Sequence, residues 1–293
     1  MKIFKRTAAF LLCAFFVCAA SGASARPLFN ASLSLTSDMK TATATYLSYN
    51  ESIDVSLNLK TGAGYYAGPF SAQVFYTGTA LKASPEFNKS AKLYACSASC
   101  SSAADSSSMT AKAKSRFYPQ SWSESEKAKY NFCNITLVPN SADGKTSPDN
   151  LDENVALLHF TSGTTAGNGR IFVPADSVKT TSNPVGQTYL SCLTDNGKVG
   201  SSRYDYGSDA QLDLSGALMY VIVSDAGDID NNKKLNSSDA LMILQHVVEI
   251  KTQTGDALKR CDTDGDSRVS SADALAVLQI ATGLMRLNDI IIR

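Results

Sequence analysis

The sequence predicts an all-β sandwich followed by a small all-α module, and three observations support this fold class. Residues 52 to 60 alternate strictly between apolar and polar side chains, as in a half-buried strand. Similar short stretches, separated by Gly, Asn, Asp and Pro, continue to about residue 223. Beyond them, two acidic loops of twelve residues recur 34 positions apart, and each leads into an apolar-patterned helix.

The first 25 residues have the pattern of a secretory signal peptide. Lys2, Lys5 and Arg6 precede an apolar run, Ala8 to Ala20, and Ala23-Ser24-Ala25 forms a small-x-small cleavage site. An apolar run of about 13 residues is shorter than the roughly 20 that a membrane span needs. We therefore expect export of a soluble chain, which would reach a cell-surface complex through a partner.

The charge balance argues against nucleic acid and anionic lipid as partners. The chain has 27 basic and 27 acidic residues, and removal of the signal peptide leaves a small acidic excess. Binding to either polyanion depends on a basic surface. The hydrophobic fraction of 44% is sufficient for a packed core.

Residues 27–223 are expected to form the sandwich domain, and residues 225–293 the helical module. Alternation or short apolar runs bounded by turn residues mark eight strands. These are 31–35, 52–60, 70–76, 132–138, 155–160, 170–173, 188–193 and 217–223. Several short strands at this spacing indicate two packed sheets.

An insertion interrupts the strands. Residues 97–115 are rich in Ser and Ala and predict a mobile loop. Ser123 and Glu126 then have the spacing of a capping box that opens a short helix through Tyr130.

Three aromatic residues, Phe117, Tyr118 and Trp122, cluster before this helix. Flat rings could stack on sugars, which would make the cluster a glycan platform. The favoured alternative is that the rings fix the helix over an open end of the sandwich, because aromatic side chains dominate protein cores.

Five cysteines follow the signal peptide, so at least one is unpaired. Two pairings, Cys96 with Cys100 and Cys133 with Cys192, and a set of free buried thiols remain open alternatives.

The two acidic loops predict two calcium sites. Calcium prefers six to eight oxygen ligands, and a tight loop can direct side chains 1, 3 and 5 at one point while position 7 adds its backbone carbonyl. Position 12 begins the next helix and completes the set. The expected ligands are Asp228, Asp230, Asn232, Lys234 and Asp239 in one loop, and Asp262, Asp264, Asp266, Arg268 and Asp273 in the other.

Both loops depart from the EF-hand pattern at two positions. Position 6, usually Gly because the turn requires positive φ, is Lys233 or Ser267. Position 12, usually Glu, is Asp in both loops.

The helices that follow carry apolar residues at helical spacing, which predicts one buried stripe on each. The stripe of the first helix comprises Leu241, Leu244, Val247 and Val248, and the second repeats it less perfectly with Leu275, Leu278 and Thr282.

The duplicated loop–helix resembles the dockerin module of cellulosome proteins over about residues 225 to 284. The resemblance lies in Gly227-Asp228, in 236–241 and in 271–275. It implies a pair of calcium-loaded units that bind a cohesin module of a scaffold protein. It also implies that loop positions 10 and 11, with the exposed helix face beyond them, contact that partner. These positions are Ser237, Ser238, Leu241, Ser271, Ala272 and Leu275.

The preceding domain resembles a cohesin in the segments 54–59, 68–76, 155–160 and 169–173. This resemblance implies a jelly-roll-like sandwich that binds a dockerin.

The function expected from both resemblances is non-catalytic assembly of an extracellular polysaccharide-degrading complex. One alternative is a carbohydrate-binding subunit tethered by its dockerin, whose sandwich holds polysaccharide. A small glycoside hydrolase is less favoured. Such an enzyme needs two carboxylates across a cleft, and none of the candidates lies in a recognisable motif. The candidates are Glu51, Glu86, Glu124, Glu126 and Glu153.

Overall fold

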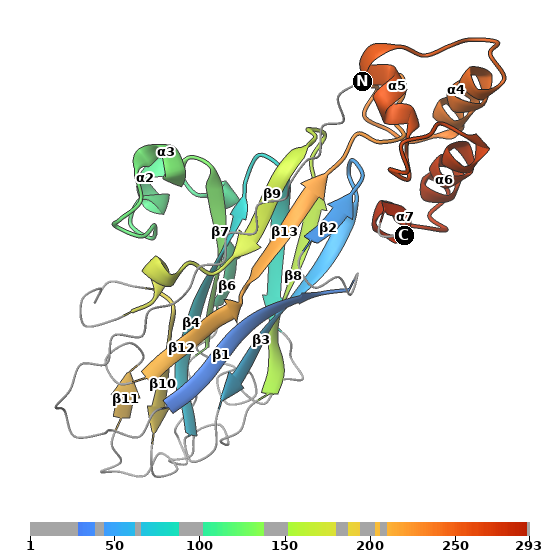
Figure 1. Cartoon of the computed structure of the whole chain (residues 1–293). Helices are drawn as coiled ribbons and strands as arrows, with labels where there is room; N and C mark the ends of the chain where they lie inside the picture. The colour runs from blue at the N-terminus through green and yellow to red at the C-terminus, as the bar shows by residue number, and fades with distance from the viewer. Residues whose placement is uncertain are drawn as a thin grey trace, which may run out of the picture.

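The computed structural model contains two packed β-sheets followed by a helical module, which confirms the predicted fold class (Figure 1). It describes residues 29–38, 44–61, 66–87, 102–137, 152–179, 187–193, 203–205 and 210–291. The predicted signal peptide and the pair Cys96 and Cys100 lie outside these residues.

One sheet has five strands in the order β12-β1-β3-β8-β5. The pairing of β1 with β12 is parallel, and the other pairings are antiparallel. The strands are β1 (Phe29–Ser37), β3 (Ser52–Thr61), β5 (Leu81–Phe87), β8 (Asp152–Ser162) and β12 (Ala210–Gly216).

The other sheet has eight strands, with a main path β11-β10-β4-β9-β13-β2, and β6 and β7 joined to it through β4. Strand β2 pairs with β13 in parallel and forms the end of the path. The strands are β2 (Ala44–Leu47), β4 (Tyr66–Thr77), β6 (Ser102–Asp105), β7 (Tyr130–Leu137), β9 (Gly167–Phe172), β10 (Tyr189–Leu193), β11 (Arg203–Asp205) and β13 (Leu218–Val223).

The main core lies between the two sheets and follows from the alternation seen in the sequence. In β3, Ile53, Val55, Leu57 and Leu59 are almost fully buried, while the residues between them face outward. Each buried side chain of this size contributes about 1.5–3 kcal/mol to stability. The side chains of β4 that point inward, among them Val74 and its neighbours two positions away, complete the opposite wall.

Five strands, β2, β5, β6, β11 and β12, occupy segments that the sequence did not predict as strands. Strand β5 contains Pro85, which has no N–H to donate, but β5 is an edge strand that pairs only with β8. Strand β6 lies within the segment expected to be a mobile loop. It pairs with β7, and Tyr76 of the core donates a hydrogen bond to Asp105 at its end. The loop prediction is therefore wrong for residues 102 to 105, and also for 106 to 108 and 111 to 114, which form a 3-10 turn and a helix.

The insertion continues with the 3-10 turn η1 (Ser106–Ser108) and the helices α2 (Ala111–Lys114) and α3 (Glu124–Lys127). The predicted capping box is present, because Ser123 and Glu126 each accept a backbone N–H of the other. Helix α3 ends at Lys127, so the prediction of a helix through Tyr130 is wrong: Tyr130 opens β7.

Helices α2 and α3 of this insertion lie beside the eight-stranded sheet (Figure 1). Aromatic rings attach the insertion to the outer face of this sheet, and not to an open end of the sandwich. Trp122 lies 4.8 Å from Phe75 and 5.4 Å from Tyr130, centroid to centroid. Phe75 is fully buried in this second cluster because it alternates with the core residues of β4. Trp122 thus packs as a structural anchor.

The C-terminal module contains four helices: α4 (Ser237–Val247), α5 (Gly255–Cys261), α6 (Ser271–Ala281) and α7 (Leu287–Ile291). Its small core is formed by α4 and α6, which face each other through Ala240, Ile243, Ala274 and Val277. Gly227 lies at φ +85°, and a Cβ there would approach Val277 to 2.9 Å, so this position requires glycine.

The predicted buried stripe of α4 is wrong. Leu241 is 55% exposed and Val248 is 59% exposed, while Ile243 is fully buried. Leu275 of α6 is likewise 56% exposed. Small residues such as Ala240 and Ala274 allow close helix contact, so the core takes the neighbouring face of each helix and leaves the leucines outside.

Helix α7 lies against the sandwich at β2. Leu287 is fully buried, and Asn288, 3% exposed, accepts a hydrogen bond from the backbone N–H of Tyr46 at 3.1 Å. Arg286 adds an ion pair to Asp38 at 2.7 Å. This helix therefore covers the edge strand of the eight-stranded sheet.

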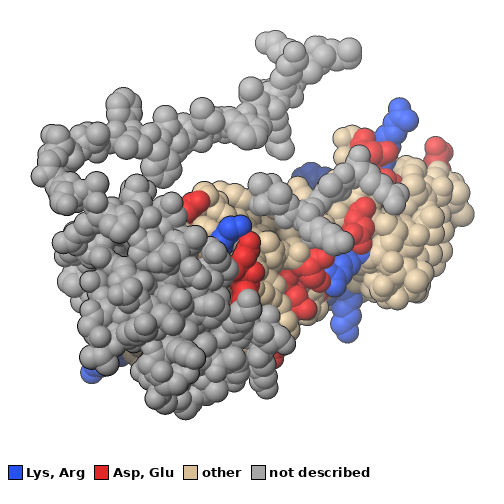
Figure 2. All heavy atoms as spheres, turned by 90° about the horizontal axis from the view of Figure 1, so that it is seen from below, with Lys and Arg blue, Asp and Glu red and all other residues tan. Residues whose placement is uncertain are grey.

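Cys133 and Cys261 are buried free thiols, so Cys133 is not bridged to Cys192. None of the described helices is long and apolar enough to cross a membrane. Seen from below, acidic and basic side chains lie interspersed over the described surface (Figure 2).

Substitution of Asn288 by Ala removes the acceptor for the Tyr46 N–H. Because one hydrogen bond contributes about 0.5–1.5 kcal/mol, we expect the Tyr46 amide to exchange with deuterium up to about tenfold faster. Lys259→Ala, an exposed residue of α5, is the control. Unchanged exchange at Tyr46 would contradict the contact.

His159 of β8 allows a prediction about pH. Its Nδ1 lies 2.7 Å from Asp54 and its Nε2 lies 3.4 Å from Glu86, and the hydrogen bond to Asp54 raises the histidine pKa. A raised pKa stabilises the fold below the unfolded value of about 6.5, and this stabilisation is lost as the pH rises through the folded pKa. The ring is 40% exposed, so the effect on stability is small.

We expect an NMR titration of His159 to give a pKa above about 6.5, and Asp54→Asn to lower it. Lys60→Ala, which removes an exposed ion pair on the same face of the sheet, should leave the pKa of His159 unchanged. A wild-type value below 6.5 would refute the assignment.

Candidate metal centres and partner surface

Three carboxylates of the first loop converge at one point. Asp228, Asp230 and Asp239 each offer an oxygen, and these atoms all lie within 4.8 Å of one another. Asp228 and Asp239 are fully buried, whereas Asp230 is exposed. The loop thus holds two buried carboxylates and one at the surface.

The second loop repeats this arrangement 34 positions later. Oxygens of Asp262, Asp264 and Asp273 also lie within 4.8 Å of one another. Asp273 is 1% exposed and corresponds to Asp239. The sequence repeat is therefore a repeat of geometry.

Both clusters fit a calcium ion. Ligands at 2.3–2.6 Å place oxygens on opposite sides of the ion at most about 5 Å apart, which matches the observed spread. Among the described residues, no Lys, Arg or His forms an ion pair with these six carboxylates. Burial of uncompensated carboxylates is unfavourable, and a divalent cation removes that penalty.

Backbone N–H groups fix the position-12 carboxylate. Asp239 accepts from Ile229 at 2.9 Å with one oxygen and from Asn236 at 3.0 Å with the other. Asn236 is the N-cap of α4, and the pair forms a capping box. Ser270 and Asp273 do the same for α6. The Asn-x-x-Asp and Ser-x-x-Asp spacings could have revealed these boxes, which the sequence analysis missed.

Position 6 of each loop has the positive φ that was expected. Lys233 has φ +68° and Ser267 has φ +70°. In this conformation the Lys233 N–H donates to Asp228 at 3.1 Å, and the Ser267 N–H donates to Asp262 at 3.0 Å. The hydrogen bond explains why the turn persists without glycine.

Burial raises the pKa of Asp228 and of Asp239 above the ordinary aspartate value. The same cause raises the pKa of Asp264. Backbone N–H donors oppose these shifts without cancelling them. Burial thus disfavours the ionised form of these carboxylates, and a bound cation would stabilise that form.

The remaining predicted ligands lie at the rim. Asn232 donates its amide to Asp230 at 2.8 Å, and Asp266 accepts the backbone N–H of Arg268 at 2.7 Å. Asp266 is outside the three-carboxylate cluster of its loop. Lys234 and Arg268 have exposed side chains, so only their carbonyls remain as candidate ligands.

An exposed apolar surface follows each loop. Ser237 and Ser238 are exposed at the start of α4, and Ser271 and Ala272 are exposed at the start of α6. One turn further, the leucine pairs Leu241/Leu275 and Leu244/Leu278 are exposed at matching positions: 55% and 56%, then 38% and 37%. Exposed apolar patches are a common feature of interaction sites.

Residues 226–279 match the family model of the dockerin type I domain. This part of the chain is dockerin-like. The predicted dockerin resemblance is therefore confirmed by an independent comparison, and the matched range contains both carboxylate clusters. No curated protein matches the chain.

Cohesins are among the solved structures that align with the chain. The seventh ScaB type I cohesin from Pseudobacteroides cellulosolvens aligns at 10% identity and a TM-score of 0.40, over 67% of this chain and 92% of the cohesin. A type II cohesin domain from the cellulosome of Acetivibrio cellulolyticus aligns at 16% identity and 0.32, over 67% and 95%. A non-cellulosomal cohesin from the archaeon Archaeoglobus fulgidus aligns at 8% identity and 0.30, over 67% and 91%.

Proposed function

We propose that this chain is a non-catalytic, exported assembly protein whose dockerin-like module binds two calcium ions and docks to a cohesin of a scaffold protein. The observation that carries the proposal is the repeat of carboxylate cluster and exposed leucine face in both loop–helix units. The dockerin type I match supports it, because it covers the same residues.

Asp228, Asp230 and Asp239 would hold one ion, and Asp262, Asp264 and Asp273 the other, with Asn232, Asp266 and the carbonyls of Lys234 and Arg268 as further ligands. Calcium supplies positive charge that compensates the clustered carboxylates. Asp239 and Asp273 each connect a loop to a helix N-terminus through backbone hydrogen bonds. Ordering the loops therefore orders the helix faces that carry Leu241 and Leu275.

The partner surface would comprise Ser237, Ser238, Leu241, Ser271, Ala272 and Leu275. Two hydroxyls and a leucine in one repeat correspond to a hydroxyl, a methyl group and a leucine in the other. A cohesin would desolvate the leucines, and the short side chains before them allow close backbone approach.

The carboxylates considered for a glycoside hydrolase have structural partners. Glu51 accepts from the Ser48 backbone at 2.8 Å, Glu86 approaches His159, and Glu124 pairs with Lys127 at 2.7 Å. Glu126 belongs to the capping box of α3. These engagements favour assembly over hydrolysis, with the sandwich as a socket for a second dockerin or for polysaccharide.

Asp239→Asn should weaken calcium binding at the first site by about tenfold or more, because a charged ligand contributes roughly 1.4 kcal/mol or more. Calorimetric calcium titration of the exported full chain measures this. Asp256→Asn, an exposed aspartate of α5, is the matched control. Identical titrations of wild type and Asp239→Asn would exclude this residue as a ligand.

The double variant Leu241→Ala and Leu275→Ala should lose about tenfold or more in affinity for a cohesin, since burial of one leucine contributes roughly 1.5–3 kcal/mol. The measurement is calorimetry of the full chain, in calcium, against a panel of type I cohesins. Leu284→Ala, 78% exposed beyond α6, tests whether any exposed leucine has the same effect. Unaltered affinity of the double variant would place the partner elsewhere.

A further inference from the structure

A polar cavity of about 420 Å³ lies between the outer face of the eight-stranded sheet and the insertion. Gln73 of β4 lies in its lining, which also includes residues 115 to 120 of the insertion. The far wall comes from Asp176, Ser177 and Gln187, near the 3-10 turn η2 (Ala175–Ser177).

The amide of Gln73 has no partner. The residue is 0% exposed, and neither its Nε2 nor its Oε1 makes a hydrogen bond. Asn134 of β7 lies directly opposite Gln73 in the strand register, and its Oδ1 also lacks a partner. Three amide atoms on adjacent strands are thus desolvated without compensation.

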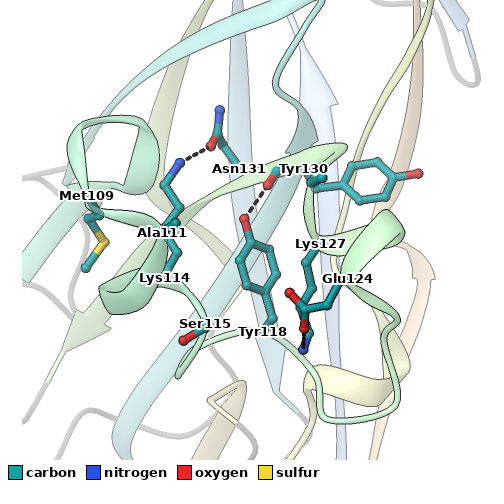
Figure 3. A pocket seen from close by; sticks show the side chains of 10 residues that line it. Met109, Ala111, Lys114, Ser115, Tyr118, Glu124, Lys127, Tyr130 and Asn131 are labelled. Carbon is teal, nitrogen blue, oxygen red and sulfur yellow. Dashed lines mark hydrogen bonds and ion pairs between the residues drawn. The ribbon is translucent and has the colours of Figure 1, made fainter.

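In a second cavity beside it, the polar side chains of the lining have hydrogen-bond or ion-pair partners. This cavity, of about 280 Å³, is lined by Lys114, Tyr118, Glu124 and Lys127 (Figure 3). Its dashed contacts pair Lys114 with Asn131, Lys127 with Glu124, and the Tyr118 hydroxyl with a backbone carbonyl. The contrast singles out the Gln73 cavity.

Unpaired buried amide atoms are costly, at about 1–3 kcal/mol each. Because β4 alternates, position 73 faces the insertion beside the aromatic Phe75, where an apolar side chain would avoid this cost. A single water needs only about 10–15 Å³, far less than this cavity offers. The volume instead lies in the range of about 300–1,000 Å³ that is usual for ligand pockets.

The lining indicates the chemistry of the ligand. An amide places a donor beside an acceptor, and a hydroxyl group can satisfy either one. Two charged residues of the lining are engaged elsewhere, Lys127 with Glu124 and Asp176 with Ser121, both at 2.7 Å. The third, Arg116, is exposed to solvent. The rings of Phe117 and Tyr118 add apolar wall. A neutral, hydroxyl-rich molecule with apolar C–H faces fits this combination.

We infer that this cavity binds one unit of a neutral saccharide through the Gln73 amide. The site is separate from the dockerin-like module and does not depend on docking. It rests on the polysaccharide alternative proposed above for the sandwich, and it gives that alternative a binding site. It also differs from a platform on Trp122, whose ring is packed among Phe75, Tyr118 and Tyr130.

The test is calorimetry of the full chain against glucose, xylose, mannose and cellobiose, with the Gln73 side-chain amide followed by NMR. At least one sugar should bind with a Kd of about 1 mM or tighter and shift the Gln73 amide signals. Gln73→Met, which keeps the side-chain length, should weaken that binding by about tenfold or more. Gln245→Met in α4 should bind as wild type does.

A second variant keeps the test decisive if Gln73→Met fails to fold. Gln120 is exposed on the cavity rim, so Gln120→Ala should weaken sugar binding at unchanged thermal stability. Absence of binding by folded wild-type protein would overturn the inference and leave the cavity to water. Equal binding by wild type and Gln73→Met would overturn it as well.

Discussion

Each loop–helix unit depends on one buried carboxylate with two tasks. Asp239 receives the backbone of the loop on one oxygen and the N-cap of α4 on the other, and Asp273 repeats both contacts for α6. An aspartate is short enough to serve loop and helix together, which gives a physical reason for its presence where a longer glutamate is usual. Loop order and helix orientation are therefore one property of the module, and a cation at the loop acts on the helix surface through this side chain.

The strands of the sandwich could be predicted from the sequence where apolar and polar residues alternate strictly and where a strand is flanked by other strands on both sides. Strand β3 shows this best, since its four inward residues are buried as expected. Prediction failed at edges. Pro85 made β5 look unlike a strand, although proline is tolerated on an edge strand. The Ser and Ala composition of β6 is typical of a loop, and this strand is ordered by its pairing with β7 and by the hydrogen bond to Asp105. Such strands exist because of their partners, which local sequence does not specify.

The candidate site likewise has features that the sequence predicted correctly and features that it did not. Ligand spacing correctly placed Asp228, Asp230 and Asp239 together, because a short loop leaves few geometries. Helical periodicity identified a common face for Leu241 and Leu244 but gave the wrong environment, since a pattern defines a face and does not reveal what covers it. The uncovered face is the more informative result. The Gln73 cavity had no sequence signal, as it arises where the insertion meets a sheet formed by distant strands.

The parallel pairings of β1 with β12 and β2 with β13 affect how the protein is made. A chain that emerges N-terminus first presents both early strands long before their parallel partners exist, although β1 can pair early with β3. Tyr46 and Asn288, which share a hydrogen bond, are 242 positions apart. Synthesis at about 5–20 residues per second separates their appearance by roughly 10 to 50 seconds. Ala44 of β2 and its partner Tyr220 of β13 are 176 positions apart, so β2 waits roughly 9 to 35 seconds for this partner, with an open edge that can pair with other chains.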